Sequence, residues 1–100
     1  MIYVIAELTF RPGTLADVME EAQTCIAETR KEDGCIAYDV FQSKTDQNQM
    51  VFVERWRDRA ALDAHFKTPH LIAWRGALMP VTTHRSVDII EAGEGAVERL

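Results

Sequence analysis

Side chains that can move a proton or hold an aromatic ring gather within residues 51–70: Glu54, Trp56, His65 and His70. Residues 50–57 have the composition of a strand, on which side chains two positions apart share a face, so Glu54 and Trp56 are expected side by side. Asp58 is a favourable helix N-cap, and the helix that it begins would fold His65 back over the strand. These residues therefore predict a small pocket that holds a carboxylate, an indole and an imidazole.

The imidazole of His65 is the natural general base of such a pocket, because it titrates near neutral pH. Glu54 could orient that imidazole or share its proton, since a carboxylate on an inward face is costly to bury without a partner. Aromatic side chains could stack on a planar ligand or donate to its oxygens. The candidate substrate-binding residues are Tyr38, Phe41, Phe52, Trp56, Phe66, His70 and Trp74. Large aromatic residues are also ordinary core residues, so Phe52 and Trp56 fit a plain hydrophobic core as well.

The two histidines of this stretch do not predict a metal site. They lie five positions apart, which separates them by about 140° around a helix at roughly 100° per residue, and Pro69 bends the chain between them. With Glu54 they could form a facial triad for iron, and this spacing does not favour it. No glycine-rich phosphate loop is present either, because Gly93 and Gly95 open no helix. We therefore expect neither a metal nor a cofactor.

The composition indicates one folded domain. Of 100 residues, 47% are hydrophobic and 27% are charged. The formal net charge is −5 and basic residues are interleaved with acidic ones, so no surface for nucleic acid or for an anionic membrane is expected. No apolar run approaches the roughly 20 residues of a transmembrane helix. Two cysteines are too few for a disulfide framework, and we expect them to be reduced in a cytoplasmic protein.

The hydrophobic periodicity predicts four strands and two helical regions. Strands are expected at residues 2–10, 35–43, 50–57 and 82–90. One long amphipathic helix is expected, with an apolar stripe over residues 15–29. Charged residues that include Glu32 belong to its solvated side, and Gly34 ends it. A short helix with His65 follows the third strand, and a second helical piece over residues 70–78 comes after Pro69.

The order β-α-β-β-α-β predicts an α+β, ferredoxin-like fold: a four-stranded antiparallel sheet with the helices on one face. The domain is expected to cover residues 1–92, with residues 93–100 as a C-terminal tail. The other sheet face would be polar in a monomer, yet apolar residues such as Ile5 and Val53 occupy both sides of the strands. Because an apolar sheet face is normally buried, we expect a homodimer in which two sheets pack face to face as a dimeric α/β barrel.

Three motifs follow one another along the chain: Glu32-Asp33-Gly34-Cys35-Ile36-Ala37-Tyr38, then Phe52-Val53-Glu54-Arg55-Trp56, then Ala64-His65-Phe66-Lys67-Thr68-Pro69-His70. In sequence and spacing they resemble the antibiotic biosynthesis monooxygenase (ABM) domain family, whose members are small dimeric α+β-barrel proteins with a ferredoxin-like protomer. The resemblance covers the chain from Tyr3 to about Ile90. Haem-degrading relatives carry an asparagine near the position of Glu54, and its absence disfavours that reaction.

The resemblance implies a cofactor-independent monooxygenase that oxidises a small quinol, polyphenol or polyketide-like aromatic with dioxygen. Such chemistry needs a base near neutrality, donors for the substrate anion and an apolar cavity, which assigns His65 and Glu54 as catalytic residues. One alternative is an isomerase that moves a proton on a small hydroxy-ketone with the same two side chains. Another is a non-catalytic module in which the aromatic residues bind a hydrophobic ligand.

Overall fold

The computed structural model describes all residues from Met1 to Leu100. The strands are β1 (Ile2–Phe10), β2 (Cys35–Gln42), β3 (Gln49–Trp56) and β4 (Thr82–Glu91). The α-helices are α1 (Met19–Thr29), α2 (Arg59–His65) and α3 (Pro69–Leu78). Two short 3-10 helices complete the fold, one before α1 (Leu15–Val18) and one after α3 (Met79–Val81).

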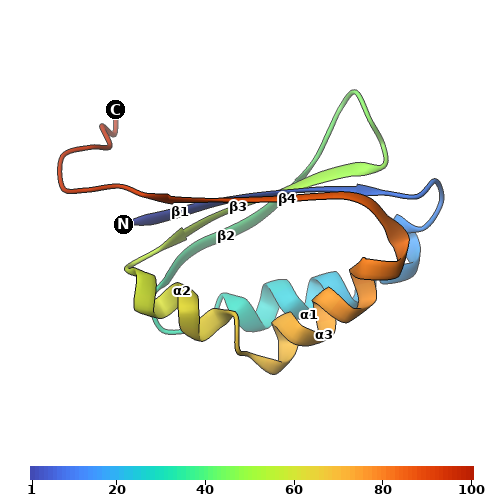
Figure 1. Cartoon of the computed structure of the whole chain (residues 1–100), viewed down its shortest axis with the longest axis horizontal. Helices are drawn as coiled ribbons and strands as arrows, with labels where there is room; N and C mark the ends of the chain where they lie inside the picture. Colours follow the sequence, from blue (N-terminus) through green and yellow to red (C-terminus); the bar gives the residue numbers. More distant parts are fainter.

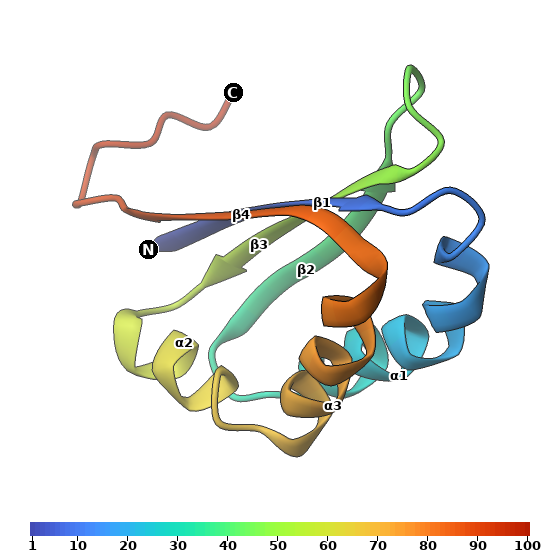
Figure 2. The same ribbon diagram turned by 45° about the vertical axis from the view of Figure 1, so that its right-hand side comes forward.

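The strands form one antiparallel sheet in the order β2-β3-β1-β4, and the helices lie on a single face of it (Figure 1). Figure 2 shows α1 and α3 beside each other beneath the sheet, with α2 close to the end of β3. This is the ferredoxin-like α+β arrangement that the element order predicts. None of the helices is long and apolar enough to cross a membrane.

Alternation along the strands separates the core from the outer face. Opposite each other on the inner face lie Val4 and Glu54, and one step along the strands Ala6 and Phe52. The inner positions of β3 are all buried beneath the helices, and they are Met50, Phe52, Glu54 and Trp56. The expectation that these four side chains share one face is therefore confirmed.

Local signals place most helix ends where the sequence predicts them. Asp58 caps α2, because its Oδ1 accepts from the backbone N–H of Ala61 at 2.8 Å. Thr68 caps α3 in the same way, with Pro69 as its first residue. The predicted long helix over residues 15–29 is wrong in its first turn, where Leu15–Val18 is a 3-10 helix and α1 begins only at Met19.

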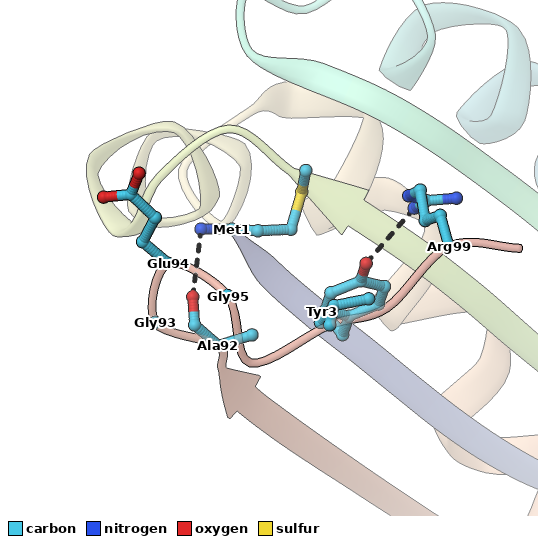
Figure 3. A pocket seen from close by; sticks show the side chains of 8 residues that line it. Met1, Tyr3, Ala92, Gly93, Glu94, Gly95 and Arg99 are labelled. Atoms are coloured by element: carbon cyan, nitrogen blue, oxygen red, sulfur yellow. Dashed lines mark hydrogen bonds between the residues drawn. The ribbon is translucent and has the colours of Figure 1, made fainter.

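The outer sheet face is exposed and carries apolar side chains among polar ones. Phe41, Val53 and Ile90 are all exposed there, next to the half-buried Tyr3 and Ile5. Residues 92–100 follow β4 and turn back over this face, where the guanidinium of Arg99 donates to the hydroxyl of Tyr3 at 3.2 Å (Figure 3). The tail covers only part of the face, so most of the apolar surface remains open.

Candidate active site

A tight contact between two segments positions the candidate base. Gly34 has a φ of +85°, and a Cβ built on it would lie 2.5 Å from the Cβ of Ala61 on α2. Only glycine therefore lets the turn between α1 and β2 pack this closely on α2. Ala61 and His65 are one helical turn apart on the same side of α2, so this turn also faces His65.

Glu32, in that turn, connects both histidines of the predicted site. Its Oε2 lies 2.7 Å from Nδ1 of His65 and 2.8 Å from Nε2 of His70. His65 is 2% exposed and Glu32 is 13% exposed, so both hydrogen bonds are largely shielded from water. In their neutral forms both imidazoles donate to the carboxylate, which fixes the His65 proton on Nδ1 and leaves Nε2 as an acceptor.

The second ring nitrogen of His65, Nε2, has no hydrogen-bond partner in the protein. His65 lines a cavity, where a ligand could supply that partner. Burial lowers the pKa of His65 below its ordinary value, and the hydrogen bond to Glu32 opposes that shift in part. His65 is therefore neutral at neutral pH, which is the form that accepts a proton.

Glu54 is held by an indole rather than by the imidazole. Its Oε1 accepts from Nε1 of Trp56 at 3.0 Å, and it is 5% exposed. Burial raises the pKa of Glu54 to about 7, although the hydrogen bond from Trp56 lowers it. The carboxyl group therefore exchanges its proton close to neutral pH. The expectation that Glu54 orients the imidazole of His65 is wrong, because the carboxylate that contacts this ring is that of Glu32.

His65 and Glu54 line one cavity of about 430 Å³ between the inner sheet face and α3. Twelve of its 16 lining residues are hydrophobic, including Val4, Leu8, Leu71 and Leu78. Tyr38 also lines the wall, but its hydroxyl lies 3.8 Å from the buried Cys25 thiol, and burial raises its pKa so that it stays protonated. The cavity thus combines an apolar interior with two groups that can give or take a proton, His65 and Glu54.

Four of the predicted substrate-binding residues line this cavity: Tyr38, Phe52, Phe66 and Trp74. Trp56 lies behind it, with its ring centroid 4.7 Å from that of His65. His70 contacts Glu32 instead of the cavity. The expected wall position of Phe41 is wrong, because Phe41 pairs with Val51 on the outer sheet face and is 59% exposed.

The sequence reasoning missed Glu32, Arg75 and Arg85, of which the two arginines line the cavity. Glu32 lies beyond the end of α1, so helical periodicity does not describe it. Its position two residues before Gly34, at a turn that must pack on α2, was the available signal.

The same three side chains are the ligand types of zinc or iron sites. The donor atoms of Glu32, His65 and His70 lie within 4.8 Å of one another, although residue spacing predicted the histidines to be apart. The prediction failed because a break after His65 separates α2 from α3 and turns both rings toward Glu32. Around a tetrahedral zinc, donors would lie roughly 3.3 Å apart, as follows from bonds of about 2.0–2.1 Å. The shared oxygen is closer to both nitrogens, at hydrogen-bonding distance.

Comparison with known proteins places the chain in a family. Residues 1–77 match the model of the family described as "Antibiotic biosynthesis monooxygenase". A protein of Escherichia coli K12 named "Probable quinol monooxygenase YgiN" is 30% identical over 93% of this chain and 99% of its own length. A Synechocystis protein without an assigned function is 39% identical over 69% of this chain, and the match spans about half, 47%, of that relative.

Solved structures agree with these matches. The structure of Rv0793 from Mycobacterium tuberculosis has a TM-score of 0.86 and 31% identity, covering 96% of this chain and 98% of its own. A crystal structure described as an antibiotic biosynthesis monooxygenase has a TM-score of 0.87 and 32% identity, covering 93% of this chain and 99% of its own. Sequence and fold together show that this chain belongs to the antibiotic biosynthesis monooxygenase family.

Proposed function

We propose that this protein is a cofactor-independent monooxygenase that oxidises a small quinol or polyphenol with dioxygen. The observation that carries the proposal is His65, a neutral histidine that lines an apolar cavity and whose tautomer is set by Glu32. The cavity size fits one small aromatic molecule. The family match and the name of the Escherichia coli relative support the same reaction class.

In the proposed reaction, Nε2 of His65 takes the hydroxyl proton of the substrate and leaves an electron-rich phenolate. The phenolate passes one electron to dioxygen. The resulting phenoxyl radical and superoxide then combine into a peroxide at a carbon of the ring. Loss of water from the peroxide gives the hydroxylated quinone, so each substrate consumes one dioxygen and releases one water. Glu54, when protonated, would donate to a substrate oxygen, and the apolar walls, which include Tyr38, would exclude water.

The test is dioxygen consumption by chelator-treated protein with a panel of dihydroxynaphthalenes, benzoquinols and anthrones. We compare the wild type with His65→Asn, because the asparagine amide can still donate to Glu32 and has no titratable nitrogen. The expected result is uptake that the chelator leaves intact and that the substitution lowers by a factor of about 10²–10⁴.

Two controls make the result decisive. A thermal melt shows whether His65→Asn still folds, and Lys44→Gln, in the exposed loop between β2 and β3, is expected to retain full uptake. Equal uptake by His65→Asn would remove His65 as the base. No uptake with any substrate would contradict the monooxygenase.

A second candidate function is a proton-transfer isomerase that acts on a small hydroxy-ketone. The supporting observation is that Glu54, with a pKa of about 7, and His65 line the same cavity and could serve as acid and base. Deuterium exchange from solvent into hydroxy-ketones, without dioxygen uptake, would favour this reaction. Ligand binding without either signal would favour a binding module.

We further propose that the protein works as a homodimer in the cytoplasm, where its free Cys25 and Cys35 stay reduced. The support for the dimer is the group of exposed apolar side chains on the outer sheet face, which includes Phe41 and Val53. Light scattering during size exclusion is expected to give twice the chain mass for the wild type and for Gln23→Glu on exposed α1. Val53→Glu should give a folded monomer, and a monomeric wild type would contradict the dimer.

A further inference from the structure

Two exposed arginines are among the residues that line the cavity, and neither pairs with a carboxylate. The basic side chains that do form ion pairs with carboxylates are Arg30, Lys31, Arg57 and Arg59. Arg75 on α3 and Arg85 on β4 form none, although the chain carries a net charge of −5. The lining of this cavity therefore contains two arginines without a carboxylate partner and one carboxyl group, that of Glu54.

Arg75 is held close to the candidate base. Its guanidinium carbon lies 5.2 Å from the ring centroid of Phe66, a cation–π contact, and the Phe66 ring is 5.9 Å from the His65 ring. The charge of Arg75 also lowers the pKa of His65. Arg75 is exposed and its guanidinium donates to no protein oxygen, so its N–H groups are available to a ligand.

Arg85 is anchored on the other side of the cavity by β4. Its Nη1 donates to Oγ1 of Thr82 at 2.6 Å and also lies 3.4 Å from the backbone oxygen of Thr82. Thr82 is itself buried and donates to the Leu78 carbonyl at 2.9 Å. One nitrogen of the guanidinium is thus fixed, and its other donors have no partner in the protein.

We propose that the substrate carries an anionic group, a carboxylate or a phosphate, that Arg75 and Arg85 bind while the aromatic ring enters the apolar interior toward His65. The proposal rests on the proposed function for the ring and the base, and it adds the charge of the substrate. Guanidinium groups bind planar carboxylates and phosphates through paired N–H donors, which a neutral quinol does not use.

A structural role is the alternative to ligand binding for the two arginines. Arg75 lies in the last turn of α3, where a positive charge is favourable at a helix end, and this role needs no ligand. A purely structural role would make substitution lower the melting temperature and weaken all ligands alike. A ligand-binding role would weaken only anionic ligands. The two roles are therefore separable by binding measurements.

The experiment is calorimetric titration with three ring-matched probes that the protein is not expected to oxidise: 1-hydroxy-2-naphthoate, 1-naphthyl phosphate and the neutral 1-naphthol. We expect both anions to bind at least tenfold more tightly than 1-naphthol. Arg75→Gln and Arg85→Gln should each weaken the anions by about tenfold and leave 1-naphthol unchanged. Lys44→Gln, which removes the same charge far from the cavity, should change nothing. Raising the salt concentration should weaken only the anions.

The outcomes separate this proposal from the proposed function. Equal affinity for all three probes, no binding of either anion, or equal weakening of 1-naphthol by the two substitutions would overturn the anionic substrate. The preference between carboxylate and phosphate then identifies which group the site fits. Arginine-dependent binding of the anions without dioxygen uptake by any quinol would keep the anion site and contradict the monooxygenase. Dioxygen uptake with neutral quinols, together with unchanged anion binding in the two arginine variants, would support the monooxygenase and contradict the anion site.

Discussion

Glu32 Oε2 lies 2.7 Å from Nδ1 of His65, although the two residues are separated by 33 positions along the chain. Glu32 belongs to the turn between α1 and β2, whereas His65 ends α2. The carboxylate accepts the Nδ1 proton and thereby determines which nitrogen of His65 faces the cavity as a base. A side chain outside the cavity therefore controls the protonation state of one inside it.

Replacing Glu32 by glutamine should abolish most activity without loss of substrate binding. The new amide can donate to Nδ1, which would move the ring proton to Nε2 and remove the base. Substitution of the equivalent carboxylate in a serine protease triad costs about 10⁴-fold in kcat, and we expect a loss of about 10²–10⁴ here. Steady-state dioxygen uptake with the best quinol measures kcat and KM.

Two further variants control this experiment. His70→Gln keeps a donor for the second hydrogen bond to Glu32, so we expect less than a tenfold loss. Glu28→Gln removes the same charge on the exposed surface of α1, and we expect its kcat to equal that of the wild type. Wild-type kcat in Glu32→Gln would show that the His65 tautomer does not matter.

The rate should fall in acid with the protonation of His65. Burial lowers the pKa of this group, so the protein is expected to remain active below pH 6.5 and to lose activity only at more acidic pH. A profile of kcat/KM from pH 4.5 to 8 measures this fall in activity, the acid limb of the profile. Glu54→Gln should keep this acid limb, since the titrating group is His65. An acid limb that disappears in Glu54→Gln would assign it to Glu54 instead.

Glu54→Gln should stabilise the protein at alkaline pH. The folded pKa of Glu54 is raised to about 7, above its unfolded value of 4.5, so the folded state binds the proton more tightly. Stability from this group is therefore fully present below pH 4.5 and is lost as the pH rises through 7, by on the order of 3 kcal/mol. Glutamine keeps an oxygen for Trp56 Nε1 and cannot ionise.

Urea denaturation of both proteins at pH 5 and pH 8 tests this linkage. The difference in free energy of unfolding between Glu54→Gln and wild type should rise with pH. The contribution of His65 has the opposite sign, lost as the pH falls, and it cancels in that difference. A difference that does not change between the two pH values would mean that Glu54 titrates normally in the folded protein.

Gly34→Ala should destabilise the protein by roughly 1–3 kcal/mol through its positive φ alone, and further through the contact with Ala61. Ala61→Gly removes that contact at a helix cost of about 1 kcal/mol. A double-mutant cycle measured by urea denaturation should show that the two substitutions together cost less than their sum. Strict additivity would mean that the turn does not press on α2.

Sequence signals succeeded here where the determinant is local. Alternation predicted the inner face of β3, and Asp58 and Pro69 predicted the ends of two helices. The approach of Glu32 to His65 depends on how a turn packs on a helix, and no local pattern describes that contact. For Phe41 the local signal was present and was not used. Strand alternation already placed Phe41 and Tyr38 on different faces of the sheet, and only its aromatic type suggested a pocket wall.

The order of the strands has a consequence for synthesis on the ribosome. β1 is a central strand whose neighbours are β3 and β4, and the backbone of Met1 bonds to that of Ala92. β1 is therefore the first strand to leave the ribosome, and one of its two edges stays unpaired until β4, the last strand, has been synthesised. Contacts of such long sequence separation form slowly, and an unpaired strand edge is a template for association with other chains. A nascent chain stalled before β4 would expose that edge of β1, so premature termination should yield aggregates rather than a smaller folded domain.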